Sequence, residues 1–175
     1  MKVRLIMINL WGILVFVEYS FLIFFVGSFG VSYFYIKWRT AETGENLFFW
    51  SFVAALFTAL SLIAHEAGHA VIAYILGIEI NFAGISWWGA FVNIRVDREE
   101  IPLLHDLLIS AAGPLVNIFI GITMIFLAKR LRQSAKKNTA RFIRTYNIFT
   151  GLFNLLPIGI ADGYWIVKDL VRMLQ

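Results

Sequence analysis

The sequence predicts a multi-span α-helical membrane protein with about four transmembrane segments and a short membrane-associated β-hairpin. Of its 175 residues, 60% are hydrophobic and only 15% are charged, which lies far outside the balance of soluble globular domains. The apolar residues also fall into runs long enough to cross a bilayer, which takes about 20 residues of helix. We therefore expect residues 1–175 to form a single membrane-embedded domain, with spans at about 8–34, 47–76, 103–128 and 142–160.

The first apolar run extends from Leu5 to Ile36. It is too long for the hydrophobic region of a secretory signal and has no convincing cleavage site, so it predicts a retained anchor. The expected span, 8–34, would be tilted, with an interfacial extension, because so long a helix exceeds the thickness of the bilayer core. Glu18 lies within the run. It could act as a proton or substrate group, but we favour contact with a polar residue of another helix or with a water-filled crevice.

The second span, 47–76, carries three ionisable residues near one end: His65, Glu66 and His69. On an α-helix, histidines four residues apart lie on one face and can bind the same metal ion, with Glu66 on the neighbouring edge. Ionisable groups are costly in lipid and mark a functional site by default. A metal site is therefore favoured over a pair of structural core histidines.

Residues 78–97, which follow Gly77, change to an alternating pattern that predicts a β-hairpin of two short strands. Their connection contains Trp87 and Trp88, which suit the membrane–water interface. Beside a metal site, such a hairpin can receive an extended peptide along its edge. A plain structural hairpin that seals the site is the alternative.

The third span, 103–128, has His105 near its start and a Gly113-Pro114 pair inside it. A lone histidine near the interface is more often solvated than a metal ligand. The proline is expected to interrupt the helix, which would leave freed backbone groups and the Asn117 amide at membrane depth. Such groups require protein or water partners.

The fourth apolar segment, 142–160, becomes irregular from Asn154 onward, where a proline, a glycine and an Asp-Gly pair break the helical pattern. Irregular backbone at membrane depth is tolerated only where it lines a cavity or is buried in protein. This placement makes Asp162 the carboxylate that would complete the metal shell. An amphipathic helix, 163–174, is expected to follow.

The chemistry that these residues can support is that of a catalytic zinc ion. The chain has no cysteine and only three histidines, so a transition metal would be held by His, Asp or Glu. Catalytic zinc commonly has three protein ligands and an open fourth position, a count that His65, His69 and Asp162 satisfy. Glu66 would then take the proton of the attacking water. We expect one Zn2+ per chain.

Three motifs together resemble the site-2 protease family of intramembrane zinc metalloproteases, in its order and across its core spans. The motifs are His65-Glu66-Ala67-Gly68-His69, Gly113-Pro114-Leu115-Val116-Asn117, and Asn154-Leu155-Leu156-Pro157 leading to Asp162-Gly163. The chain departs from the family pattern at Gly159, where a second proline is frequent, and at Ala161, where leucine is usual. Neither change removes a predicted ligand, and no stretch is expected to form a PDZ or CBS domain.

The resemblance implies that His65, His69 and Asp162 are the zinc ligands and that Glu66 is the catalytic base. It implies substrate or oxyanion contact for Asn117 and Asn154, and presentation of the substrate by the hairpin. The expected function is hydrolysis of a peptide bond in a transmembrane or membrane-associated protein or peptide. A non-proteolytic zinc-containing protein that binds membrane peptides is the alternative, and an ion transporter or channel is the weakest reading.

The net charge of +4 does not indicate a nucleic-acid partner. Seven of the fifteen Lys and Arg residues lie at 129–144, between apolar spans, so they predict a juxtamembrane loop beside the lipid bilayer. The expected location is the plasma membrane. The resemblance places the active site near the cytoplasmic face, whereas the positive-inside rule places the 129–144 loop in the cytoplasm.

Overall fold

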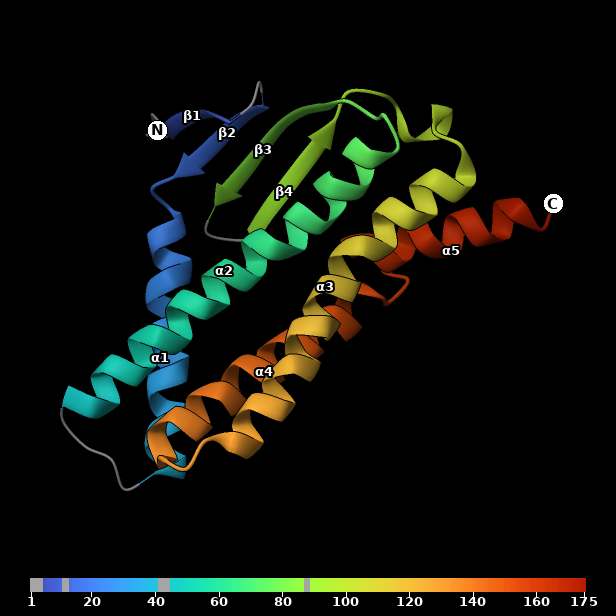
Figure 1. The fold of residues 1–175 in the computed structure, drawn as a ribbon. Coiled ribbons are helices and arrows are strands. Elements are labelled where there is room, and N and C mark those ends of the chain that lie inside the picture. The colour runs from blue at the N-terminus through green and yellow to red at the C-terminus, as the bar shows by residue number, and fades with distance from the viewer. Residues whose placement is uncertain (1–4, 11–12, 41–44, 87–88) are drawn as a thin grey trace.

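The computed structural model describes residues 5–10, 13–40, 45–86 and 89–175. Helices form one layer of the molecule, and a sheet lies across one end of it (Figure 1). The elements are, in chain order, β1 (Leu5–Leu10), β2 (Ile13–Glu18), α1 (Phe21–Arg39), α2 (Glu45–Ile75), β3 (Ile80–Ser86), β4 (Gly89–Ile94), a 3-10 turn (Arg98–Glu100), α3 (Leu103–Arg130), α4 (Ser134–Asn154) and α5 (Asp162–Met173).

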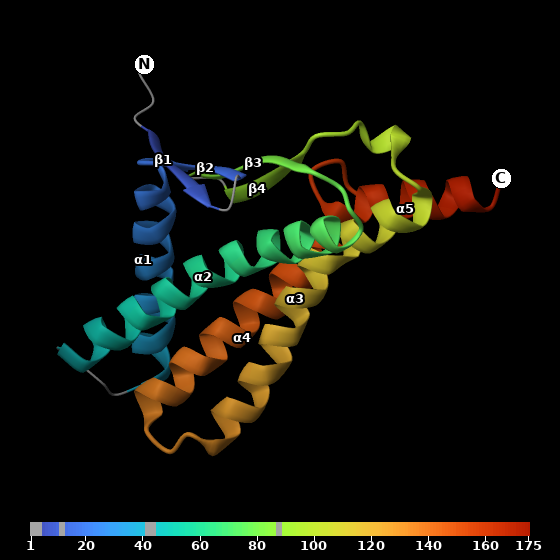
Figure 2. The ribbon, with the colours of Figure 1, turned by 45° about the horizontal axis from the view of Figure 1, so that its top comes forward.

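The strands form one sheet in the order β1-β2-β3-β4. β1 pairs antiparallel with β2, as β3 does with β4, whereas β2 and β3 run parallel. The sheet lies above the C-terminal half of α2 (Figure 2), with β4 packed against that helix. The hairpin expected at 78–97 is therefore confirmed, with shorter strands; Trp87 and Trp88 lie outside the described residues. Within the described sheet, one edge of β4 has no partner strand.

The prediction of a transmembrane span at 8–34 is wrong for its first half. The run opens with β1 and β2, and α1 begins only at Phe21. Ile recurs in β1 and Val in β2, and both residue types favour extended structure. Periodicity alone cannot assign a short apolar run to helix or strand. Glu18 therefore ends a strand, and its carboxylate accepts a hydrogen bond from Ser20 Oγ at 2.8 Å.

In the described part of the chain, α1, α2 and α3 are long and apolar enough to cross a membrane. Their outer faces carry exposed apolar side chains, as lipid-facing helices do. α4 differs from the span expected at 142–160, because it begins at Ser134, includes basic residues of the predicted loop, and gives way to turns and bends at residues 155–161. The multi-span helical fold is confirmed with α1, α2 and α3 as candidate spans. In the described part of the chain α4 is not among them, so the fourth span expected at 142–160 is not supported.

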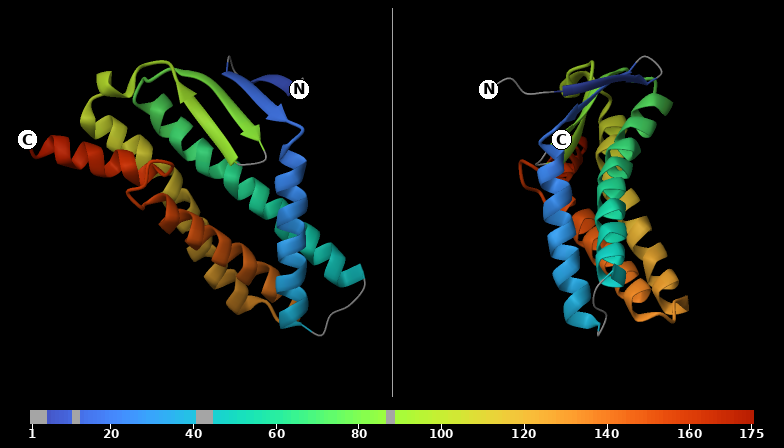
Figure 3. Two further views of the ribbon diagram at one scale, coloured as in Figure 1. Left: turned by 180° about the vertical axis from the view of Figure 1, so that it is seen from behind. Right: turned by 90° about the vertical axis from the view of Figure 1, so that its left-hand side faces the viewer.

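The expected interruption of the third span is also wrong, since α3 continues unbroken through Pro114. α3 and α4 lie side by side in both views of Figure 3, and they approach closely at Gly151 of α4. A Cβ added to Gly151 would lie 2.9 Å from the Pro114 carbonyl oxygen and 2.8 Å from Ile118 Cγ1. A residue without a side chain is therefore required where α4 covers the proline turn of α3.

We expect Gly151→Ala to destabilise the helix pair by about 1–3 kcal/mol, the usual cost of overpacking. Gly27→Ala is the matched control, because a Cβ at Gly27 of α1 meets no atom within 4 Å. Replacing a helical glycine in open space should be neutral or stabilise by up to about 1 kcal/mol. Thermal unfolding in detergent measures both changes, and equal unfolding temperatures would contradict the packing described.

Candidate metal centre

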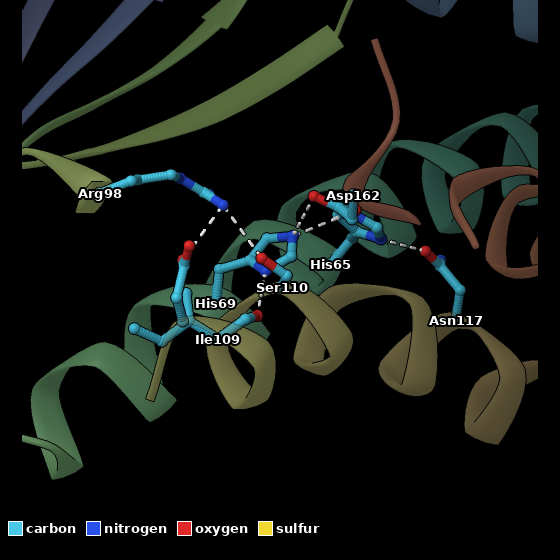
Figure 4. A network of polar contacts seen from close by, with 8 residues as sticks. His65, His69, Arg98, Ile109, Ser110, Asn117 and Asp162 are labelled. Carbon is cyan, nitrogen blue, oxygen red and sulfur yellow. Dashed lines mark hydrogen bonds and ion pairs between the residues drawn. The ribbon is translucent and has the colours of Figure 1, made fainter. Parts of the chain in front are cut away.

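Three side chains from distant parts of the chain converge at the end of α2 that lies beneath the sheet. His65 and His69 come from α2, and Asp162 is the first residue of α5 (Figure 4). The two Nε2 atoms are 3.2 Å apart. Asp162 Oδ2 lies 3.2 Å from His65 Nε2, and Asp162 Oδ1 lies 3.4 Å from His69 Nε2.

These spacings fit a tetrahedral zinc ion. Ligand atoms about 2.0–2.1 Å from zinc at tetrahedral angles lie about 3.3 Å from one another, close to the separation of the two Nε2 atoms and to the distance from each Nε2 to its nearer carboxylate oxygen. Among the described residues, this trio is the group of His and carboxylate side chains whose ligand atoms gather within 4.8 Å. The donor set of two imidazoles and one carboxylate is also typical of catalytic zinc, so the residues present fit this metal.

Each histidine is oriented by a hydrogen bond from its other ring nitrogen. His69 Nδ1 lies 2.6 Å from the carbonyl oxygen of Ile109 in α3, and His65 Nδ1 lies 2.5 Å from Asn117 Oδ1. A carbonyl can only accept, so His69 Nδ1 donates, and its Nε2 faces the position that His65 Nε2 and the Asp162 carboxylate also face. Such partners fix the tautomer and direction of metal-binding imidazoles. Both rings are nearly inaccessible, with 5% and 8% exposure.

Asp162 is positioned by the turn that precedes α5. A Cβ added at Gly163 would collide with the backbone of Leu155 and Leu156, so this glycine lets the first turn of α5 lie directly on the end of α4. Burial alone would raise the pKa of the Asp162 carboxyl, but its contacts with His65 and His69 hold that pKa below its ordinary value. The carboxylate is therefore ionised and ready to accept a cation.

Gly113 provides the space behind the ligand atoms. An added Cβ would collide with His69 Nε2 and would lie 2.7 Å from His65 Nε2. The backbone of α3 therefore passes against the face of both imidazoles. A glycine at this position is a steric requirement of the site, which the sequence motif alone did not explain.

Glu66 and the ligands open onto a cavity of about 720 Å³. Its walls are the ligand-bearing face of α2, strand β4 and the segment after it, and the end of α4. Ala90, Val92 and Ile94 of β4 contribute apolar lining, and Asn154 contributes an amide. The cavity therefore places a strand edge, a carboxylate and a metal-binding trio around the same space.

The structure separates the two asparagines that were expected to contact substrate. Asn154 lines the cavity, so substrate contact stays a proposal for this residue. Asn117 is fully buried, is absent from the cavity wall, and bonds to His65 from behind. Its geometry fits ligand orientation instead. His105 lies outside the ligand trio and is half-buried.

Sequence reasoning missed a second polar cluster beside the cavity. Arg98 Nη1 lies 3.2 Å from Asp106 Oδ1 and donates to Ser110 Oγ at 3.0 Å (Figure 4). Its guanidinium also covers the Trp165 ring of α5 at 4.6 Å. The cluster ties the segment after β4 to α3 and α5. The sequence did contain one sign of this cluster: Asp106 is a carboxylate at the start of an apolar span, where it requires a partner.

Comparison with known proteins assigns this arrangement to a family. The model of peptidase family M50 matches residues 51–138. A zinc metalloprotease of Methanocaldococcus jannaschii is 25% identical over 164 residues, covering 93% of this chain and 44% of its own length. The Bacillus subtilis protein YwhC, whose name also describes a zinc metalloprotease, is 29% identical over 146 residues, covering 64% of this chain and 66% of its own.

Among solved structures, the site-2 protease from Methanocaldococcus jannaschii has the same fold. It superposes with a TM-score of 0.64 over 97% of this chain and 73% of that one, at 22% sequence identity. The first two curated relatives are longer proteins, of which this chain spans 44% and 31%.

We expect Gly113→Ala to weaken zinc binding by 10-fold or more, because the new methyl group occupies the space of the ligand nitrogens and displaces them. Zinc affinity of the purified protein, measured by competition with a chelator, tests this. Gly27→Ala serves as the control and should bind zinc as the wild type does. Unchanged affinity in Gly113→Ala would contradict the position of α3 against the imidazoles.

Proposed function

The chain belongs to peptidase family M50, and on this premise we propose that it is an intramembrane zinc endopeptidase. The proposed substrate is a transmembrane or membrane-associated protein or peptide. The observation that carries the proposal is the convergence of His65, His69 and Asp162 at zinc-ligand spacing, with Glu66 on the wall of the same cavity.

The proposed roles follow from this geometry. His65, His69 and Asp162 would hold the ion through two Nε2 atoms and one carboxylate. Zinc supplies a Lewis acid that polarises the scissile carbonyl and activates water at neutral pH. Glu66 accepts a proton from the attacking water and delivers it to the leaving amine as the peptide bond breaks. Asn154, which lines the cavity, would donate to the substrate backbone.

The edge of β4 that has no partner strand in the described sheet suggests how a peptide would enter. The Val92 backbone in this strand already contacts the Glu66 carboxylate, so a paired segment would replace that contact. An extended segment could pair with this edge through backbone hydrogen bonds, as peptides do in other proteins that bind by strand addition. Ala90 and Val92 belong to β4 and line the cavity that contains Glu66, so a paired segment would pass over the catalytic carboxylate. An extended backbone also exposes the amide that a protease must reach, which a helical substrate does not.

The β4 wall of the cavity would suit apolar side chains of a substrate segment. Among the described side chains, the charged lining of the cavity beyond Glu66 and Asp162 at the metal centre consists of Asp97 and Arg98, and Arg98 is already paired with Asp106. The β4 wall contributes Ala, Val and Ile side chains. Segments from within or beside a bilayer have matching character.

We expect Glu66→Gln to lower kcat by about 10²–10⁴-fold, the contribution of a general base, while zinc content stays at one ion per chain. Comparing the proteomes of cells that contain the wild type and the variant should reveal a peptide that accumulates uncut only in the variant. Purified protein then tests cleavage of that peptide. Cleavage by Glu66→Gln at the wild-type rate would contradict the proposal.

The alternative is a zinc-containing protein that binds membrane peptides without cutting them. A purely structural zinc ion needs no carboxylate such as Glu66 beside an open cavity, which favours the protease. Stoichiometric zinc together with no turnover of any peptide that accumulates in cells would instead support the alternative.

We place the protein in the plasma membrane with the metal centre near the cytoplasmic face. The α3–α4 connection lies at the opposite end of the helices from the metal centre (Figures 1 and 3). Because the chain contains no cysteine, single substitutions report topology without background. Ser134→Cys should react with an impermeant maleimide on intact cells, and Glu100→Cys only after permeabilisation. The reverse pattern would place the metal centre on the outer side.

A further inference from the structure

A chain of buried amide side chains runs from the metal centre into α4. Asn117 Nδ2 donates to Asn147 Oδ1 at 2.9 Å, and Asn117 Oδ1 lies 2.5 Å from His65 Nδ1. Asn117 and Asn147 are both 0% exposed. Asn147 belongs to α4, contacts no predicted ligand and is absent from the lining of the cavity, so neither the metal centre nor the proposed reaction explains it directly.

At the α4 end of this series of hydrogen bonds, the orientation of the Asn147 amide is fixed. Asn147 Nδ2 lies 2.9 Å from the Ile143 carbonyl oxygen and 3.0 Å from Ser61 Oγ. The Ser61 hydroxyl donates its own hydrogen to the Phe57 carbonyl at 2.8 Å, so its lone pair faces Asn147. Both neighbours of Asn147 Nδ2 therefore accept hydrogen bonds, and an amide oxygen in that position would face two acceptors.

The orientation of the Asn147 amide fixes the orientation of the Asn117 amide. With Nδ2 of Asn147 committed to Ile143 and Ser61, its Oδ1 must face Asn117. Only the NH₂ group of Asn117 can donate to that oxygen, which leaves Asn117 Oδ1 toward His65. An oxygen there requires a proton on His65 Nδ1.

We propose that Asn147 is a positioning residue that sets the tautomer of His65 through Asn117. Its amide keeps the proton on Nδ1 and leaves the Nε2 lone pair directed at the metal position. This role depends on one part of the proposed function, namely that His65 is a ligand of zinc. His69 needs no such series of side chains, because its Nδ1 donates directly to the Ile109 carbonyl. A backbone carbonyl can only accept, so it fixes the His69 tautomer by itself.

This difference gives the two histidines unequal dependence on side chains. A backbone carbonyl cannot be removed by substitution, whereas an isolated Asn117 could rotate and present either its oxygen or its nitrogen to His65. Asn147 removes that freedom. If the buried Asn117 amide rotated, its oxygen would face the oxygen of Asn147. The amide would lose that hydrogen bond and could not replace it with one to water.

Asn147→Leu tests the role, with Asn138→Leu as the matched control. Asn138 lies in the same helix and is also buried, at 3% exposure, but its Nδ2 donates to the Arg39 carbonyl at the end of α1. We expect Asn147→Leu to weaken zinc binding by about 10-fold, the low end for partners of metal-ligating histidines. Asn138→Leu should remain within two-fold of wild type.

Nitrogen NMR of protein labelled with ¹⁵N-histidine reads the tautomer itself, without metal or activity. The chain has three histidines, and His105→Gln removes the ring outside the site. In the metal-free wild type, His65 Nδ1 should carry a proton. In Asn147→Leu the His65 signals should shift toward a mixture of tautomers, while those of His69 should not.

Equal zinc affinities of Asn147→Leu and wild type would overturn the proposal, as would equal losses in both leucine variants. An unprotonated His65 Nδ1 in the metal-free wild type would also overturn it, and this measurement stands even if Asn147→Leu does not fold. If the wild type binds no zinc while its Nδ1 is protonated, the proposed function fails and the positioning role holds.

Discussion

The structure depends on one constraint: two imidazole lone pairs and one carboxylate must point at the same position inside a nearly dry interior. Polar groups in such a place are stable only when every hydrogen-bonding atom has a partner. The Nδ1 atoms of His65 and His69 therefore require acceptors, and both acceptors come from α3. The packing of α3 against α2 is thus as much a part of the metal centre as the ligands.

The remaining elements follow from this pairing. Gly113 lets α3 approach the imidazoles, and Gly151 lets α4 cover α3 at Pro114. Because α4 packs closely against α3, Asn147 reaches Asn117. The turn after α4 then leads to Asp162, the first residue of α5. The sheet closes the cavity from above. Each glycine thus stands where a helix must approach a neighbour for a polar contact to form.

Sequence reasoning succeeded where a local pattern carries the chemistry. Two histidines four apart on one helix face, and an aspartate in a broken helical segment, could be identified as a possible metal set before their contact was known. The hairpin was readable from alternation. The segment at β1 and β2 was not, because Ile- and Val-rich apolar runs suit a strand and a membrane helix equally. The roles of Asn147 and Arg98 depend on contacts between elements, which have no local signature. The partner of His69 is a backbone carbonyl, a group that every residue possesses.

X-ray absorption at the zinc edge tests the central claim most directly, because it identifies the atoms around the metal without a substrate. We predict that wild-type protein loaded with one zinc ion has two imidazole nitrogens and light-atom oxygen donors around it. In His65→Ala the spectrum should show one imidazole fewer. A wild-type spectrum without two imidazoles, or a His65→Ala spectrum that keeps both, would contradict the account.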